Sequence, residues 1–186
     1  MQTRAFAPRG HRTISGSISL LLSVLAASLL ILAAAVLASA NAHTEAPEAN
    51  DLRVSQVYGG GGNAGATYTN DFIELFNAGA GSINLSGWSV QYASATGTSW
   101  QVTNLSGSLV AGHYYLIQEA QGAGGTTPLP TPDATGTIAM SGSQGKVALV
   151  NSTTALSGAC PTGASIIDFI GFGAANCYEG LVRRRS

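Results

Sequence analysis

The sequence predicts an all-β domain of the sandwich or barrel type, preceded by an export segment. After residue 43, short apolar runs alternate with clusters of Gly, Ser, Asn and Pro, and no stretch shows a sustained helical period with caps. Only 9% of the residues are charged, which excludes coiled-coil and long helical proteins. The 45% of apolar residues excludes an intrinsically disordered chain.

The first 42 residues differ in kind from the rest. Three arginines (Arg4, Arg9 and Arg12) precede a nearly uninterrupted apolar run, Ile18–Ala38, which ends among small residues. This order predicts a secretory signal peptide over residues 1–42. The alternative is a retained anchor helix, because about 20 apolar residues can span a bilayer. Either way the remainder is expected outside the cytoplasm, secreted in the first case and membrane-anchored in the second.

Residues 43–51 form a short polar linker, and the domain is expected over residues 52–180. Seven candidate strands follow the linker: Arg53–Tyr58, Asp71–Asn77, Trp88–Ala93, Ser99–Thr103, Tyr114–Gln118, Lys146–Val150 and Ile166–Phe172.

Alternation along the strands predicts which side chains share a face, because successive residues of a strand point to opposite sides. The strand 71–77 carries apolar residues on both sides, which indicates a central position. In the strand 146–150, Val147 and Leu149 are expected to face inward, opposite Ala148 and Val150. Two stretches, Gly59–Gly65 and Gly122–Thr135, are rich in Gly or Pro and are predicted to be irregular surface loops.

The charge balance argues against direct binding to nucleic acid. The export segment contains three arginines and no acid, so its cleavage changes the net charge from −1 to −4. Three of the five remaining basic residues are Arg183–Arg185, and without them the domain has two basic and nine acidic residues. Such a surface repels a phosphate backbone.

Several blocks, in the same order, resemble the lamin tail domain, most closely its bacterial secreted branch. They are Val54–Tyr58 with the following glycines, Asn70–Asn77, Leu85–Val90, Gly112–Ile117, Pro128–Asp133, Gly145–Val150 and Asp168–Gly173. The resemblance covers about residues 52–180. It implies an immunoglobulin-like β-sandwich without a catalytic centre. In bacteria such domains often accompany secreted nucleases, phosphatases or other hydrolases, and they are thought to bind or tether.

The last six residues, 181–186, depart from the family pattern. The family continues through further loop and strand, whereas here the chain ends in Leu181-Val182 and three arginines. We interpret this tail as the product of a truncation or frame shift, which would leave a sandwich edge uncovered. The alternative is a genuine basic tail that binds acidic surfaces.

Two cysteines and three carboxylates are the candidate structural sites. Cys160 and Cys177 are the only cysteines, and both lie in the exported part, so a disulfide is expected; two reduced structural cysteines are the alternative. Asp71, Glu74 and Asp168 lie within apolar strands and would need hydrogen bonds if buried. We interpret them as structural carboxylates bonded to loop backbone amides, such as those of residues 59–65, rather than as acid/base or metal-binding groups.

The sequence predicts no catalytic site, no cofactor site and no metal site. The least disfavoured metal is calcium, with oxygens from Asp71, Glu119, Asp133 and Glu179, although the chain lacks a calcium-binding loop motif. His113 has no evident partner for a catalytic triad. Four aromatic residues are candidates for binding a sugar or peptide, namely Trp88, Trp100, Tyr114 and Tyr115, with core packing as the alternative for the two tryptophans.

These observations predict a non-enzymatic, exported binding or adhesion module with an undefined extracellular ligand or protein partner. Contact with a membrane is expected only through an uncleaved N-terminal helix. The alternative function is an accessory-domain fragment of a larger secreted hydrolase whose catalytic part is absent from this chain. A catalytic domain encoded downstream would favour that alternative.

Overall fold

The computed structural model describes residues 51–179. The predicted signal or anchor segment (1–42), nearly all of the linker (43–51) and the basic tail (181–186) lie outside these residues. Between residues 51 and 179, no helix is long and apolar enough to span a membrane.

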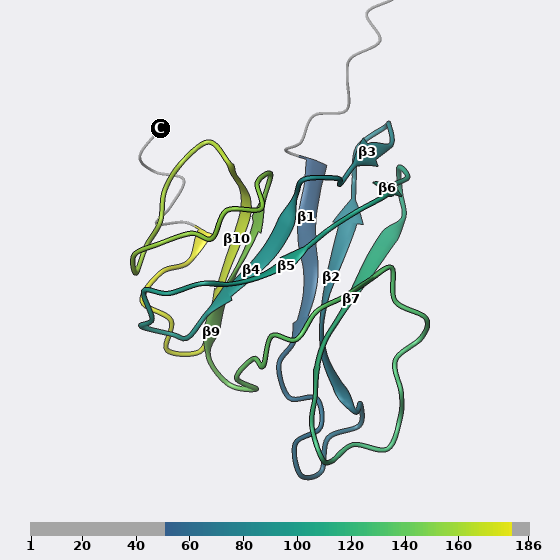
Figure 1. Ribbon diagram of the computed structural model, residues 1–186, viewed down its shortest axis with the longest axis vertical. Helices are drawn as coiled ribbons and strands as arrows, with labels where there is room; N and C mark the ends of the chain where they lie inside the picture. The colour runs from purple at the N-terminus through teal and green to yellow at the C-terminus, as the bar shows by residue number, and fades with distance from the viewer. Residues whose placement is uncertain (1–50, 180–186) are drawn as a thin grey trace, which may run out of the picture. The chain divides into compact units, whose positions relative to one another are not determined.

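The described part of the chain is all-β, and its strands form two four-stranded sheets and one small ribbon (Figure 1). Sheet I has the order β1-β2-β7-β8, sheet II the order β10-β9-β4-β5, and β3 pairs with β6. The strands are β1 (Leu52–Tyr58), β2 (Asn70–Asn77), β3 (Ile83–Asn84), β4 (Ser89–Ala93), β5 (Gln101–Asn104), β6 (Ser108–Leu109), β7 (Tyr114–Gln121), β8 (Ala134–Thr135), β9 (Gly145–Val150) and β10 (Ile166–Phe172).

All seven predicted strands are present, with small shifts at their ends, and the strand 71–77 is central as predicted. It corresponds to β2, which pairs with β1 on one side and β7 on the other. The prediction missed β3, β6 and β8, because a strand of two residues is too short to show an alternating pattern. β8 runs parallel to β7 within the segment that was predicted to be irregular loop.

The main hydrophobic core lies between the two sheets. Sheet I contributes inward-facing residues such as Ile73 and Ile117, and sheet II contributes Val90, Val147 and Leu149, all fully buried. The predicted inward orientation of Val147 and Leu149 is therefore confirmed. The arrangement is a two-layer sandwich, consistent with the immunoglobulin-like fold that the sequence indicates.

A second core covers the opposite face of sheet II. Ala148 and Val150 point away from the main core and pack with Trp100, Phe169 and Cys177. Every residue of β4 and of β9 is consequently buried. Sheet II is therefore covered on both faces, whereas several residues on the outer face of sheet I remain partly or fully exposed.

The two glycine-rich loops lie mostly at the surface, and they also pack against each other. Gly62 is buried at φ +68°, and a Cβ on it would lie 2.2 Å from the Cα of Gly122. The loops exchange backbone hydrogen bonds, including Gly124 N to Gly62 O at 2.7 Å. Glycine is required here because two backbones approach more closely than any side chain allows. The prediction of irregular loops is therefore confirmed for most of these residues; the exceptions are the buried glycines of 59–62 and the two-residue strand β8.

Candidate ligand-binding face

The outer face of sheet I carries a row of three side chains across its strands. Phe76 of β2 lies between Arg53 of β1 and Tyr114 of β7, its register partners. The Arg53 guanidinium carbon is 5.9 Å from the centre of the Phe76 ring, and the Tyr114 ring centre is 4.8 Å from it. Tyr114 is 59% exposed. The row therefore presents an exposed aromatic ring at one end and an exposed cation at the other, with Phe76 between them.

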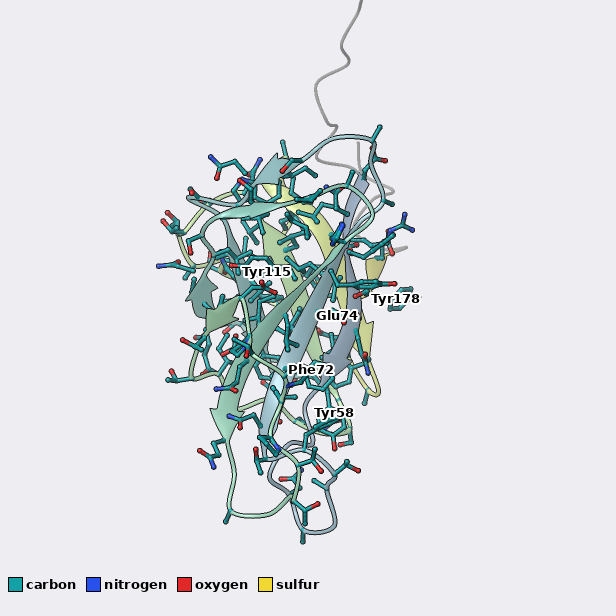
Figure 2. All side chains as sticks on the ribbon, turned by 90° about the vertical axis from the view of Figure 1, so that its right-hand side faces the viewer. Tyr58, Phe72, Glu74, Tyr115 and Tyr178 are labelled. Carbon is teal, nitrogen blue, oxygen red and sulfur yellow. A yellow bond between two sulfur atoms is a disulfide. The ribbon has the colours of Figure 1, made fainter. Side chains whose placement is uncertain are left out.

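A second aromatic cluster lies further along the same face. Tyr58 stacks on Phe72, with ring centres 5.2 Å apart, and Tyr68 meets both rings edge-on. Phe72 is buried beneath these neighbours, while Tyr58 and Tyr68 are partly exposed. Figure 2 looks onto this side of the molecule and shows Tyr58, Phe72 and Glu74 in succession along the strands.

A bulge in β1 places both clusters on one face. Tyr58 lies five positions after Arg53, and such an odd spacing would send the two side chains to opposite sides of a regular strand. The pairing of β1 with β2 shifts between Val54 and Gln56, so one extra residue, Ser55, is accommodated. As a result Val54 and Val57 both pack toward the main core, and Arg53 and Tyr58 both face outward.

A row with two polar members and one leucine, called the polar row below, separates the two aromatic clusters. Glu74 lies at its centre, with Gln56 and Leu116 as its register partners. The Ser55 hydroxyl donates to Glu74 Oε1 at 2.6 Å, and this contact is exposed. Glu74 thus accepts a bond from a side chain, not from a loop amide, because it points outward on the face opposite to the loop contacts of Asp71.

The outer face of sheet II, which the second core and its covering segments close to solvent, contains a buried cation, Lys146. Its side chain is fully buried, and Nζ donates to Gly97 O at 2.8 Å, Ala159 O at 2.7 Å and Asn176 Oδ1 at 3.1 Å. Nζ also lies 5.5 Å from the centre of the Trp100 ring. Burial lowers the pKa of Lys146. The ammonium is held by neutral oxygens and a ring face.

The disulfide lies beside this lysine. Cys160 and Cys177 are bonded, as predicted, and each directly follows a residue that accepts a hydrogen bond from Lys146. The bridge and the lysine therefore fasten the same two segments over sheet II.

The loop after β9 completes the cover. Gln91, fully buried in β4, donates to Thr154 O at 2.9 Å and accepts from Leu156 N at 2.8 Å, while the Ser89 hydroxyl donates to Ser152 O at 2.6 Å. Polar side chains of a buried strand thus bind the covering loop.

Two buried carboxylates fasten loops to the interior of the sandwich. Asp71 Oδ1 accepts from Gly61 N and Oδ2 from Met140 N, both at 2.8 Å. Glu119 Oε2 accepts from Ile138 N at 2.9 Å. Burial raises the pKa of Asp71 against the effect of its two backbone hydrogen bonds. Asp71 therefore bonds the predicted glycine-rich loop and also the segment that leads to β9.

Glu119 is the less satisfied of the two carboxylates. Its Oε1 and the Thr103 hydroxyl oxygen are both buried without a partner at hydrogen-bond geometry. Burial raises the pKa of Glu119, with a smaller contribution in the same direction from the charge of Asp71; the Thr103 hydroxyl and the Ile138 amide act against it. The Thr103 hydroxyl lies close enough to Glu119 to lower its pKa, although the two side chains form no hydrogen bond of good geometry.

Asp168 joins the two sheets at one side of the sandwich. Its Oδ2 accepts from Val54 N of β1 at 2.8 Å, and its Oδ1 from the amide of Phe169 at 2.9 Å. Val54 borders the bulge of β1, where the backbone amide is directed out of the ladder. Asp168 thus bonds strand backbone rather than a loop, and it closes the gap between β1 and β10.

The structure separates the four candidate calcium donors. The charges of Asp71 and Glu119 act on each other, but Asp133 accepts from Leu116 N at 2.8 Å on the exposed side and Glu179 follows β10. Within residues 51–179, no three His, Cys, Asp or Glu side chains group so as to hold a metal ion.

Of the four candidate aromatic residues, only Tyr114 lies open to solvent. Trp100 is buried in the second core, Trp88 packs against the main core, and Tyr115 is buried with its hydroxyl donating to Ser106 O at 2.9 Å. The prediction did not identify Arg53, Tyr58 or Phe76 as parts of one face. Phe72 and Phe76 share a strand face by alternation, but the bulge that brings the β1 residues alongside leaves no clear mark in the sequence.

These features define a class of protein: a two-layer β-sandwich with one sealed sheet face and one open aromatic face. The Lamin Tail Domain family matches the chain over residues 45–173, which include all but the last residues of the described part. The chain belongs to the Lamin Tail Domain family. A comparison with curated proteins finds no match.

Proposed function

We propose that this protein is an exported, non-catalytic binding or adhesion module that engages its ligand through the outer face of sheet I. The main support for this proposal is that the outer faces of the two sheets differ in how open they are to solvent. The outer face of sheet II is closed by the loop after β9, by Lys146 and by the disulfide. The outer face of sheet I is open around Tyr114, and the partly exposed rings of Phe76, Tyr58 and Tyr68 extend the aromatic surface along it; apolar surface that is contiguous in this way is typical of interaction sites.

The non-enzymatic part of the proposal is supported by the positions of the buried acids. Asp71, Glu119 and Asp168 each bind backbone amides inside the sandwich, where no substrate can reach them. His113, beside the open face, has no acidic or nucleophilic partner among the contacts of the described residues. These three acids therefore hold the fold and are not placed for proton transfer to a substrate.

Export and membership of the bacterial secreted branch are parts of the same proposal. The charged, apolar and small-residue order of residues 1–42 supports export, and so does the Cys160–Cys177 disulfide, since such bonds persist in oxidising compartments. Secretion of the full chain, with a mature N-terminus near His43, would distinguish cleavage from anchoring.

The test uses the full chain, purified after secretion, and the cell-envelope fraction of the source organism. We expect the protein to sediment with the envelope, and we expect Tyr114→Ala to weaken this retention. Tyr178→Ala is the matched control, because Tyr178 is 53% exposed but follows β10 of sheet II and belongs to none of the strands of sheet I. Equal retention of the two variants, or no retention of the wild type, would refute the proposed face. A measurable hydrolase rate would contradict the non-catalytic part.

A further inference from the structure

The open face of sheet I is nearly neutral and has an unusual polar centre. Arg53 and Glu74 contribute one charge of each sign, and no other charged residue of β1, β2 or β7 faces outward. Gln56 and Gln118 add amide groups that can donate and accept hydrogen bonds. The face thus combines aromatic rings with neutral hydrogen-bonding groups.

Within residues 51–179, the surface around this face carries no cluster of like charges that would attract a charged polymer. Residues 51–179 contain nine Asp, Glu, Lys and Arg side chains, and four of them are buried: Asp71, Glu119, Lys146 and Asp168. The five that remain are too few and too dispersed to attract a polyanion, which requires clustered basic residues. A cationic polymer would likewise find no acidic patch on this face. Charge complementarity therefore favours an uncharged ligand.

Most of the apolar surface on this face is aromatic, and Leu116, the register partner of Glu74, adds one partly buried aliphatic side chain. Tyr114 is the only large hydrophobic side chain of sheet I that is strongly exposed, and Tyr58 and Tyr68 are partly exposed around Phe72. The face of an aromatic ring carries partial negative charge and attracts positively polarised C–H groups. A pyranose ring presents such C–H groups on its faces and hydroxyl groups at its edge.

A protein partner suits this face less well. The centre of a stable protein interface is apolar and desolvated, and charged residues are depleted there. Here the centre is Glu74 with its exposed bond to Ser55, which an apolar partner would bury without compensation. Hydroxyl groups of a sugar can instead donate to the Glu74 carboxylate while the sugar rings contact the aromatic clusters on either side.

We infer that the ligand of this face is an uncharged polysaccharide chain that lies along β2 and contacts both aromatic clusters, with its hydroxyl groups bonded to the polar row between them. This inference rests on the proposed function. Phe72 and Phe76 are four residues apart on one strand, so the clusters are about 13 Å apart. An extended oligosaccharide spans that distance and a single sugar does not.

The experiment is affinity electrophoresis of the full chain through gels that contain defined soluble polymers. The neutral probes are hydroxyethyl cellulose, glycol chitin, galactomannan and dextran, and the polyanionic controls are alginate and duplex DNA. We expect at least one neutral polymer to retard the wild type and the polyanions not to do so. Tyr114→Ala should weaken the interaction about tenfold, the effect of losing one aromatic contact, while Tyr178→Ala should leave it unchanged.

A second variant tests the use of both clusters. Tyr58→Ala should weaken the binding of a hexasaccharide derived from the retarding polymer, because the hexasaccharide reaches both clusters. It should leave the binding of a disaccharide unchanged, because the disaccharide contacts only the cluster that contains Tyr114. Thermal unfolding of each variant separates a lost contact from a lost fold. Retardation by none of the neutral polymers, equal retardation by alginate, or insensitivity to Tyr114→Ala would overturn the inference.

Treatment of the envelope fraction distinguishes failure of this inference from failure of the proposed function. If periodate oxidation of envelope sugars abolishes retention and protease treatment does not, the inference is supported. If protease alone abolishes a Tyr114-dependent retention, the partner is a protein: the inference fails and the proposed function stands. If retention never depends on Tyr114, both fail.

Discussion

Replacement of Lys146 by methionine should lower the free energy of unfolding by about 2–4 kcal/mol, although methionine matches the lysine stem in length. The substitution leaves Gly97 O and Ala159 O without the donor that binds them at 2.8 and 2.7 Å. An unsatisfied buried carbonyl costs about 1–3 kcal/mol. Removal of the bond to Asn176 and of the ring contact with Trp100 adds to the loss.

One effect acts in the opposite direction. Burial disfavours the ammonium and lowers the pKa of Lys146, so a neutral side chain removes a desolvation cost. We expect the loss of the donor to outweigh this gain, because the disulfide holds the segment of Ala159 in place. Both contacts are part-buried, which sets the net loss toward the lower end of the range.

The assay is urea unfolding, followed by tryptophan fluorescence, with Arg53→Met as the matched control. Arg53 is the only other basic residue in the described part of the chain, and it is exposed, so its replacement should leave stability within error of the wild type. The expected loss for Lys146→Met corresponds to a fall in Tm of about 10 °C for a domain of this size. A Lys146→Met variant as stable as Arg53→Met would refute the reasoning.

Three further predictions concern the cover, the buried acids and the loops. Replacement of Cys160 and Cys177 by serine should lower stability by about 3 kcal/mol for a closed loop of this size. It should also speed acylation of Lys146, the only lysine of the chain, as measured by mass spectrometry. Glu119→Gln should raise Tm at neutral pH: because burial raises the pKa of Glu119, its contribution to stability is full below its ordinary pKa of 4.5 and is lost as pH rises through the raised value. Gly62→Ala should destabilise the domain through both its positive φ and the facing backbone, as measured by thermal unfolding.

Each of these predictions has a control. Acylation of Lys146 at an unchanged rate in the serine variant would show that the bridge does not shield the lysine. A Tm of Glu119→Gln that varies with pH as steeply as that of the wild type would contradict the assignment to Glu119. Gly65→Ala is the control for Gly62→Ala: Gly65 also has a positive φ, of 79°, but a Cβ there meets no atom within 4 Å. Gly62→Ala should therefore destabilise the domain by roughly 2 kcal/mol more than Gly65→Ala. Equal destabilisation would exclude the packing argument.

The longer strands and their faces were predictable because alternation is a local property. Ile73 and Leu75 point inward and Phe72 and Phe76 outward in β2, as the period of two requires. The disulfide was predictable because the exported part contains only two cysteines.

The carboxylates were less predictable, because alternation does not tell which face of a strand is buried. Glu74 was expected to resemble Asp71, yet it lies on the open face, while Glu119 proved to be the second deeply buried acid. Glu74 lies among apolar residues of β2, and Glu119 among those of β7. Only the pairing of the two strands decides which face of each strand meets the core.

The sequence by itself therefore determined the all-β class, the family, the long strands and the cysteine pair, since each depends on residue type and short spacing. Only the tertiary structure decided that sheet II is sealed and sheet I open, because the cover joins Lys146 to residues 30 positions away, at Asn176. It also decided that Arg53 and Tyr58 share a face. That outcome follows from one extra residue in the pairing of β1 with β2, and the register between two strands is a property of the pair, not of either sequence.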